Sequence, residues 1–237
     1  RLVQAGIPVR LLEGAKDLPE TLRASTFHPP SLDMIEELGL DKPLIAQGLI
    51  CDKYQYRDRR TGDIAEFNLG VLKDDTRHPY RLQAEQWKFV HLAWKALQDQ
   101  YSQLAECHLN HAVKGVHQTT DGVEVLVWDN GQEKLIEGSY LIAADGADSA
   151  VRKACAIVFE GFTYPERFLV ASTTFPLETK FERLSLVNYV SDPEEWLVLL
   201  RAPSMWRVLL PTDPSIEDDG LFLSDRWIQD QLHHMAP

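Results

Sequence analysis

Residues 141–152 constrain the fold of this chain more than any other segment. They read Leu-Ile-Ala-Ala-Asp-Gly-Ala-Asp-Ser-Ala-Val-Arg. The apolar start predicts a buried strand, and Asp145-Gly146 predicts a tight turn. Ser149 is a good N-cap for a short helix that carries Arg152. Such a turn places a carboxylate and backbone N–H groups at the carboxyl edge of a sheet, where α/β folds bind ligands. A capped turn without a ligand explains the same residues equally well.

The first thirteen residues predict a helix end followed by a parallel strand. Residues 1–5 read as the last turn of a helix, which Gly6 ends and Pro8 prevents from resuming. Residues 9–12 are almost continuously apolar, which is typical of a parallel strand buried on both faces. The strand ends at Glu13. In dinucleotide-binding βαβ units an acidic residue in this place binds the ribose, but a solvated strand end is the simpler alternative.

The remaining periodicity alternates between helices and antiparallel strands. Helices are predicted over residues 29–39, over residues 82–106 and after Ser224. A three-stranded meander is predicted over residues 112–118, 123–128 and 134–142, with turns at Thr120-Asp121-Gly122 and Asp129-Asn130-Gly131. Residues 54–72 predict a hairpin around Thr61-Gly62-Asp63. A second antiparallel sheet is predicted over residues 168–174, 184–190, 196–201 and 206–210, with turns at Asp192-Pro193 and Ala202-Pro203-Ser204.

Composition argues against several classes of protein. The 237 residues hold 24 Lys+Arg and 36 Asp+Glu, a formal net charge of -12, so a nucleic-acid binder is not expected. The longest strongly apolar runs fall well short of the roughly 20 residues that a membrane span needs. Three cysteines, an odd number without a CxxC pair, favour the reducing cytoplasm. Cys107, His108, His111 and His117 do not have the spacing of a zinc site, so no metal is expected.

The Asp-Gly segment resembles a family motif. Ala144-Asp145-Gly146 through Ser149-Ala150-Val151-Arg152 is similar to the DG motif, G-x-D-G-x-x-S-x-V-R, of the class A flavoprotein aromatic hydroxylases, the para-hydroxybenzoate hydroxylase family. Three further segments of the chain also resemble segments of the family, and all occur in the family's order. Together they extend the resemblance over essentially the whole chain. They are residues 6–13, similar to the second strand of the FAD-binding fold, the arginine loop at Arg23-Ala24 with the helix after it, and the crossover at residues 159–164.

The resemblance implies an α/β fold with a Rossmann-like FAD-binding domain that includes a three-stranded β-meander, plus an antiparallel-sheet substrate domain. The FAD-binding domain would comprise residues 1–48 and 78–158, and the substrate-binding domain residues 49–77 and 159–237. The family also has a GxGxxG turn before the position of Arg1 and a GD segment after that of Pro237. We therefore expect this chain to be the middle of a longer enzyme.

The activity that the resemblance implies is that of an FAD-dependent monooxygenase. It would hydroxylate a small aromatic molecule with NADPH or NADH and O2, through a flavin C4a-hydroperoxide. A related halogenase, epoxidase or reductase, and a truncated binding module without flavin, are the alternatives. The sequence leaves the oligomeric state open, with a homodimer as one candidate. It also leaves the nucleotide open, because Asp148 places a carboxylate near the expected nucleotide path and Ala144 replaces the motif's first glycine.

The resemblance also implies roles for single residues, although it assigns no catalytic residue. The cofactor ligands are Glu13, Arg23, Gln86, Asp145, Gly146 and Arg152. Glu13 would bind the FAD ribose, and the planar guanidinium of Arg23 suits the diphosphate or ribityl region. At the head of the long helix the spacing favours Gln86 as the ribityl ligand, with Gln83 as a close alternative.

Substrate contacts are expected from the antiparallel sheet, where three residues have polar reach: Tyr189, Arg201 and Arg207. Three tryptophans on or near the same sheet could line an aromatic pocket, but tryptophans in such positions more often belong to a core. They are Trp196, Trp206 and Trp227. We therefore expect all three to be core residues.

Overall fold

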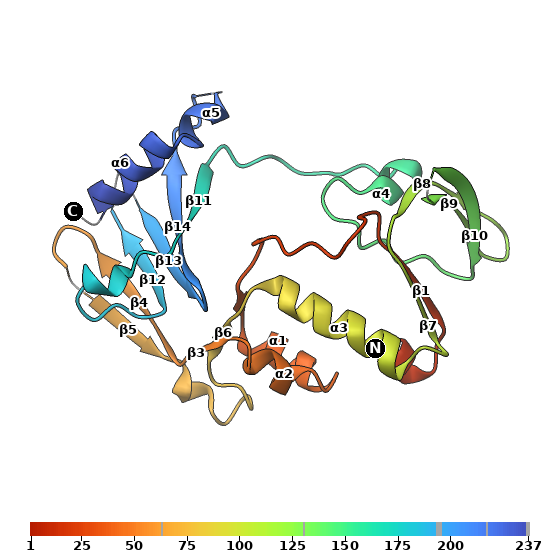
Figure 1. Ribbon diagram of the computed structural model, residues 1–237, viewed down its shortest axis with the longest axis horizontal. Coiled ribbons are helices and arrows are strands. Elements are labelled where there is room, and N and C mark those ends of the chain that lie inside the picture. The colour runs from red at the N-terminus through yellow and green to blue at the C-terminus, as the bar shows by residue number, and fades with distance from the viewer. Residues whose placement is uncertain (63, 130, 193–195, 217, 236–237) are drawn as a thin grey trace. The chain divides into compact units, whose positions relative to one another are not determined.

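The computed structural model describes residues 1–62, 64–129, 131–192, 196–216 and 218–235 (Figure 1). The chain forms two compact units. Unit 1 comprises Arg1–Thr21 and Val90–Phe162, and unit 2 comprises Leu22–Phe89 and Thr163–Pro237. The boundary crosses helix α3 (Gln86–Gln100). The predicted boundaries between the FAD-binding and the substrate-binding domain lie at other residues, and the assignment of these two domains stays a prediction.

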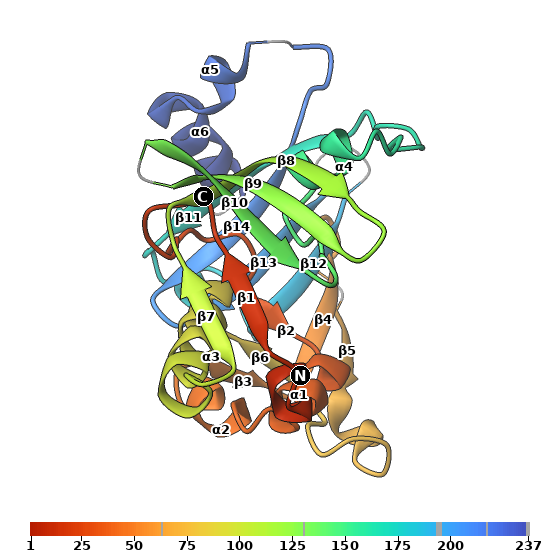
Figure 2. The ribbon, with the colours of Figure 1, turned by 90° about the vertical axis from the view of Figure 1, so that its right-hand side faces the viewer.

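Unit 1 begins with a single turn of 3-10 helix, η1 (Val3–Ala5), which ends at Gly6 with a φ of 76°. Strand β1 (Val9–Leu12) then pairs in parallel with β7 (Ala105–His108), which confirms the predicted parallel strand (Figure 2). Leu12 packs against the core of the neighbouring sheet, whereas Leu11, on the other face, is 38% exposed. The expected burial on both faces is therefore wrong for the described residues, because Arg10 and Leu11, which lie on opposite faces, are both exposed.

The predicted meander is present in unit 1. It consists of β8 (His111–Gln118), β9 (Val123–Asp129) and β10 (Gln132–Gly138), all antiparallel. Its third strand ends at Gly138 rather than at residue 142, and Ile142 is 71% exposed. The buried strand expected before Asp145 is therefore wrong, because residues 139–144 pair with no strand in the described part of the chain. Asn130, in the second predicted turn, lies outside the described residues.

Unit 2 is built on a six-stranded sheet of order β11-β14-β13-β12-β4-β5 (Figure 1). Its strands are β4 (Lys53–Asp58), β5 (Ile64–Asn68), β11 (Arg167–Thr173), β12 (Val187–Ser191), β13 (Leu197–Ala202) and β14 (Met205–Thr212). The predicted sheet and hairpin are both confirmed, although Asp63 of the hairpin turn and Pro193 of a second turn lie outside the described residues. The sheet is mixed rather than purely antiparallel, because the hairpin joins it through a parallel pairing of β4 with β12.

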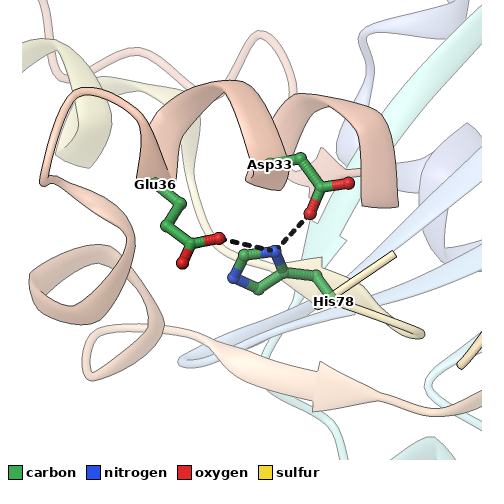
Figure 3. Close-up of side chains that lie close together, drawn as sticks. All are labelled: Asp33, Glu36 and His78. Carbon is green, nitrogen blue, oxygen red and sulfur yellow. Dashed lines mark hydrogen bonds and ion pairs between the residues drawn. The ribbon is translucent and has the colours of Figure 1, made fainter. Parts of the chain in front are cut away.

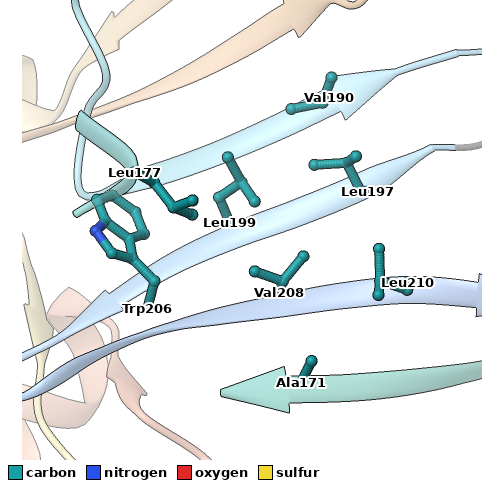
Figure 4. Close-up of a cluster of buried hydrophobic side chains, with 8 residues drawn as sticks. All are labelled: Ala171, Leu177, Val190, Leu197, Leu199, Trp206, Val208 and Leu210. Atoms are coloured by element: carbon teal, nitrogen blue, oxygen red, sulfur yellow. The ribbon is translucent and has the colours of Figure 1, made fainter. Parts of the chain in front are cut away.

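One face of this sheet carries the main core of unit 2, shown in Figure 4. The buried side chains are Ala171, Leu177, Val190, Leu197, Leu199, Trp206, Val208 and Leu210. Helix α6 (Asp225–Met235) covers them with Trp227, Ile228 and Leu232. Its predicted N-cap is confirmed, since the Ser224 hydroxyl accepts from the Trp227 N–H at 3.3 Å. Short helices η3 (Leu177–Thr179) and α5 (Asp219–Phe222) complete this layer.

The rest of unit 2 consists of short elements that lead into α3. Helix α1 (Pro29–Glu36) buries Leu32 and Ile35 as predicted. It is followed by α2 (Asp41–Ile45), and η2 (Leu69–Leu72) follows the hairpin. Strands β2 (Thr26–Phe27), β6 (Arg81–Gln83) and β3 (Leu49–Cys51) form a small sheet. The helix predicted from residue 82 begins only at Gln86, because β6 is paired on both sides and buries Leu82 completely.

No helix in the described ranges has both the length and the apolar content that a bilayer crossing requires.

Candidate functional site

The Asp-Gly turn of unit 1 is fixed by its own side chains. The Ser149 hydroxyl donates to Asp145 Oδ1 at 2.5 Å, and the Val151 N–H donates to Oδ2 at 3.1 Å. These two hydrogen bonds lower the pKa of Asp145. Ser149 also caps α4 (Ala150–Ala154) by accepting from the Arg152 N–H at 2.9 Å, as predicted. Gly146 has a φ of 87°, a conformation that disfavours any residue with a Cβ.

Two charged residues after the turn are also held locally. The Arg152 guanidinium donates to the Ala147 carbonyl at 3.3 Å and lies 4.9 Å from the centre of the Phe159 ring. Asp148 forms an ion pair with Lys153, which lowers the pKa of its carboxyl group. The negative charge that was expected to repel a nucleotide phosphate is therefore paired with a cation.

Glu13 stands directly after β1 and is half-buried. Its Oε1 accepts from the Ala15 N–H at 2.8 Å. Its backbone N–H donates to the His108 carbonyl at 2.9 Å, and its carbonyl accepts from the His111 N–H at 2.8 Å. The acidic side chain is thus fixed at the carboxyl end of a parallel strand pair, which is where α/β folds place a ribose ligand.

The arginine loop of unit 2 is held by Arg207. The Arg23 side chain is exposed, but its carbonyl accepts from Arg207 Nη2 at 3.4 Å. The same Nη2 donates to the Leu22 carbonyl at 3.0 Å, and Nη1 donates to Ser25 Oγ at 3.1 Å. Arg207 is 5% exposed, and burial lowers its pKa. Its predicted contact with substrate stays a prediction, but its hydrogen bonds identify it as a residue that positions the loop.

The two candidate glutamines differ in their surroundings. Gln83 is fully buried on β6, and its Oε1 accepts from Thr26 Oγ1 at 3.0 Å. Its Nε2 is buried and has no hydrogen-bond partner among the described residues. Gln86 is the first residue of α3 and is exposed, while its backbone N–H donates to the Ala24 carbonyl at 2.9 Å. The structure thus brings the head of the long helix next to the arginine loop.

The other sheet residues differ in role. The Tyr189 hydroxyl accepts from Arg81 Nη1 at 3.2 Å. Arg201 lies over the ring of Trp206, with 5.7 Å between the guanidinium carbon and the ring centre. The core prediction holds for Trp206 and, in part, for Trp227, but Trp196 is 39% exposed. Sequence reasoning missed Arg81, because nothing in a three-residue strand indicates what its side chain reaches.

Three side chains in the described part of the chain lie close enough to share a metal ion, and they are Asp33, Glu36 and His78 (Figure 3). His78 Nδ1 lies 2.7 Å from Asp33 Oδ1 and therefore donates to it, because a carboxylate only accepts. The Thr76 hydroxyl donates to the same carboxylate at 2.8 Å. Arg77 Nε lies 2.7 Å from Glu36 Oε2. Because Asp33 is hydrogen-bonded by His78 and Thr76 and Glu36 is ion-paired with Arg77, we interpret the group as a network that ties the segment before β6 to α1. The expected absence of a metal stays a prediction.

We expect Asp33→Asn to destabilise the protein by about 1–2 kcal/mol at neutral pH, because the hydrogen bonds to a charged acceptor are weakened. The His78 and Thr76 hydrogen bonds lower the pKa of Asp33. This stabilisation is complete above the carboxyl group's unfolded-state pKa and is lost as the pH falls through the lower folded-state value. Urea unfolding should therefore show a gap between variant and parent that narrows towards acid pH. Asp99→Asn, which affects an exposed pair with Lys95, is the control. An equal loss in both variants would contradict the network's role.

Comparison with known proteins identifies the family. The family model of the FAD binding domain matches residues 1–223. Para-nitrophenol 4-monooxygenase from Pseudomonas sp. (strain WBC-3) is 30% identical over 220 residues, which are 92% of this chain and 54% of that relative. The 6-hydroxy-3-succinoylpyridine 3-monooxygenase HspB from Pseudomonas putida (strain DSM 28022 / S16) is 26% identical over 225 residues, 93% of this chain and 56% of that relative.

Solved structures agree with this match. The crystal structure of p-nitrophenol 4-monooxygenase PnpA from Pseudomonas putida DLL-E4 has a TM-score of 0.87 and 25% sequence identity, and the match covers 100% of this chain and 58% of that one. The chain spans about half the length of the curated relatives it matches. By the match over residues 1–223, the chain belongs to the FAD binding domain family, as its resemblance to the class A flavoprotein aromatic hydroxylases predicted.

Proposed function

We propose that the protein is an FAD-dependent monooxygenase that hydroxylates a small aromatic molecule with NADPH or NADH and O2. The family match over residues 1–223 carries the proposal. Relatives named as para-nitrophenol and pentachlorophenol 4-monooxygenases support the substrate class. FAD, when bound, supplies the redox chemistry, whereas the protein binds and orients the reactants and excludes water.

The residues present fit this cofactor. In unit 1, Glu13 offers a fixed, half-buried carboxylate to a ribose. Gly146 turns the backbone with a positive φ and has no Cβ atom that would keep a ligand away from the turn. Asp145 would bind FAD directly or through water, and Arg152 supplies positive charge nearby. In unit 2, the exposed guanidinium of Arg23 on its anchored loop suits the diphosphate. These assignments rest on the geometry of each unit taken separately.

We assign FAD binding, in a Rossmann-like domain, to residues 1–48 and 78–158, and substrate binding to residues 49–77 and 159–237. The meander of β8, β9 and β10 and the sheet of unit 2 support this division. Tyr189 and Arg201 remain the proposed substrate residues. For Arg207, also predicted from the sequence as a substrate residue, we propose the role of holding the arginine loop instead. Three free cysteines are compatible with the proposed cytoplasmic location. A homodimer is one candidate assembly.

The test uses the complete protein that contains this chain. We expect the purified protein to carry a flavin chromophore, and we expect a phenol to stimulate its oxidation of NADPH or NADH. Product analysis by mass spectrometry should show a single added oxygen atom, whereas a halogenase or a reductase would give other products. A folded complete protein that takes up no flavin would overturn the proposal.

We expect Gln83→Leu to weaken FAD binding about tenfold and Gln86→Leu to change it less than twofold. Gln83 Nε2 has no hydrogen-bond partner among the described residues, and a buried donor without a partner is costly unless a ligand satisfies it. This observation favours Gln83 over Gln86, whereas the spacing in the sequence favoured Gln86. The measurement is flavin retention and the dissociation constant by fluorescence quenching. Circular dichroism shows whether each variant is folded. A larger loss in Gln86→Leu would restore the original assignment.

A further inference from the structure

Arg81 is a half-buried cation that forms no ion pair with a carboxylate in the described part of the chain. Its Nη1 donates to the Tyr189 hydroxyl at 3.2 Å, and its guanidinium carbon lies 4.1 Å from the centre of the Tyr54 ring. Its Nε is buried and has no hydrogen-bond partner among the described residues. The chain as a whole has a net charge of -12, so acidic partners are plentiful. A guanidinium that is held by two tyrosines instead is suited to an anionic ligand.

The titratable groups that interact with Arg81 in the described part of the chain include His28, Cys51, Tyr54 and Tyr189, and none of these four is a carboxylate that would neutralise it. Desolvation and the charge of Arg81 lower the pKa of His28, which favours the neutral imidazole. Burial raises the pKa of the Cys51 thiol to about 11, so this group is neutral as well. Asp52, which also acts on the Cys51 thiol, is exposed and forms no ion pair with Arg81.

An aromatic surface, made of Tyr54, Tyr56, Phe67 and Tyr189, adjoins Arg81. Tyr56 stacks on Tyr189 with 4.8 Å between ring centres, and Phe67 stacks on Tyr54 at 5.2 Å. Tyr56 and Phe67 are 47% and 45% exposed. Side chains alternate between the faces of a strand, so Tyr189 lies on the face opposite to its core neighbour Val190. The exposed parts of Tyr56 and Phe67 offer a planar aromatic molecule an apolar surface near the guanidinium.

We propose that Arg81 determines substrate specificity by favouring an aromatic substrate whose ring carries an anionic oxygen, a phenolate. This inference rests on the proposed function and adds a residue to it. The Tyr189 oxygen accepts from Arg81, so its own proton is left to donate to the substrate oxygen. Arg81 therefore orients the tyrosine and supplies positive charge, whereas the aromatic surface binds the ring. Because Arg81 acts on the substrate partly by orienting the Tyr189 hydroxyl, it is in that respect a positioning residue.

The test compares 4-nitrophenol with nitrobenzene, which has the same ring without the anionic oxygen. In the complete protein, we expect Arg81→Met to weaken 4-nitrophenolate binding about tenfold and to raise the apparent pKa of the bound phenol by about one unit. Nitrobenzene binding should change less than twofold. Arg81→Lys keeps the positive charge but loses the planar guanidinium. Its affinity for 4-nitrophenolate should lie between those of the parent protein and Arg81→Met. Arg226→Met removes an exposed arginine on α6 and is the matched control.

Each alternative result has a distinct meaning. Equal weakening of both ligands by Arg81→Met would show a purely structural role and overturn the inference. If Arg81→Met weakened the binding of benzoate but not of 4-nitrophenolate, the residue would recognise an aryl carboxylate rather than a phenolate, and the assignment would be overturned. A protein without flavin that still shows Arg81-dependent phenolate binding would refute the proposed function alone. An active flavoprotein in which Arg81→Met binds phenolate normally would refute this inference alone.

Discussion

Arg207→Met is expected to lose about 3 kcal/mol in the free energy of unfolding and about tenfold in FAD affinity. Arg207 is 5% exposed, and its guanidinium donates hydrogen bonds to two backbone carbonyls and to Ser25 Oγ in the arginine loop. Methionine fills much of the volume but leaves these acceptors without donors, at about 1–3 kcal/mol for each buried group. Relief of the buried charge offsets part of that loss. The loop that carries Arg23 is then no longer fixed, and the proposed cofactor contact is weakened.

Arg201→Met is the matched control for the measurements of stability and flavin affinity. Arg201 lies on the neighbouring strand and stacks over Trp206. Cation–π contacts of this kind are worth about 0.5–1 kcal/mol at exposed sites. Urea unfolding followed by far-UV circular dichroism, together with a flavin titration of each folded variant, separates the two effects. If Arg207→Met instead raised KM for the aromatic substrate and left stability and flavin affinity unchanged, the original substrate assignment would hold and the positioning role would not.

The local signals in the sequence predicted most of the regular structure. Alternation of apolar residues located the meander and the sheet of unit 2, and N-cap chemistry located the starts of α4 and α6 at Ser149 and Ser224. These features are decided within a few residues of one another, so a single sequence carries them. The same holds for Gly6, where the left-handed conformation ends η1.

Long-range pairing was beyond the reach of these signals. Leu82 fits the helical spacing of α3, yet it lies on strand β6 because β2 and β3 flank that strand from distant parts of the sequence. The parallel pairing of β4 with β12 joins residues more than 130 positions apart, and nothing near Tyr56 indicates it. The hydrogen bonds of Arg81 and Arg207 depend on these pairings. Sequence reasoning therefore named Arg207 as important but could not identify the loop it holds.

Trp206→Ala is expected to lose about 3–5 kcal/mol in the free energy of unfolding, the usual range for removal of a buried tryptophan. Trp206 is 3% exposed, packs within the core cluster of unit 2, and donates from Nε1 to Glu178 Oε2 at 2.8 Å. Alanine leaves a cavity and removes the donor from that carboxylate. Trp206→Phe keeps one aromatic ring in the core and loses the hydrogen bond and part of the volume, so we expect a smaller loss of about 1–2 kcal/mol.

Trp196→Ala tests whether the loss in the free energy of unfolding depends on the burial of a tryptophan in this sheet rather than on the residue type alone. Trp196 is 39% exposed and meets the edge of Phe168 with 6.4 Å between ring centres. Removal of this partly solvated ring should cost about 1 kcal/mol or less, because little core volume is lost and one aromatic pair is broken. Chemical unfolding by circular dichroism measures all three variants without relying on tryptophan fluorescence. Equal losses for Trp196→Ala and Trp206→Ala would contradict the placement of the core on the α6 face of the sheet, since only that placement makes Trp206 the more costly residue to remove.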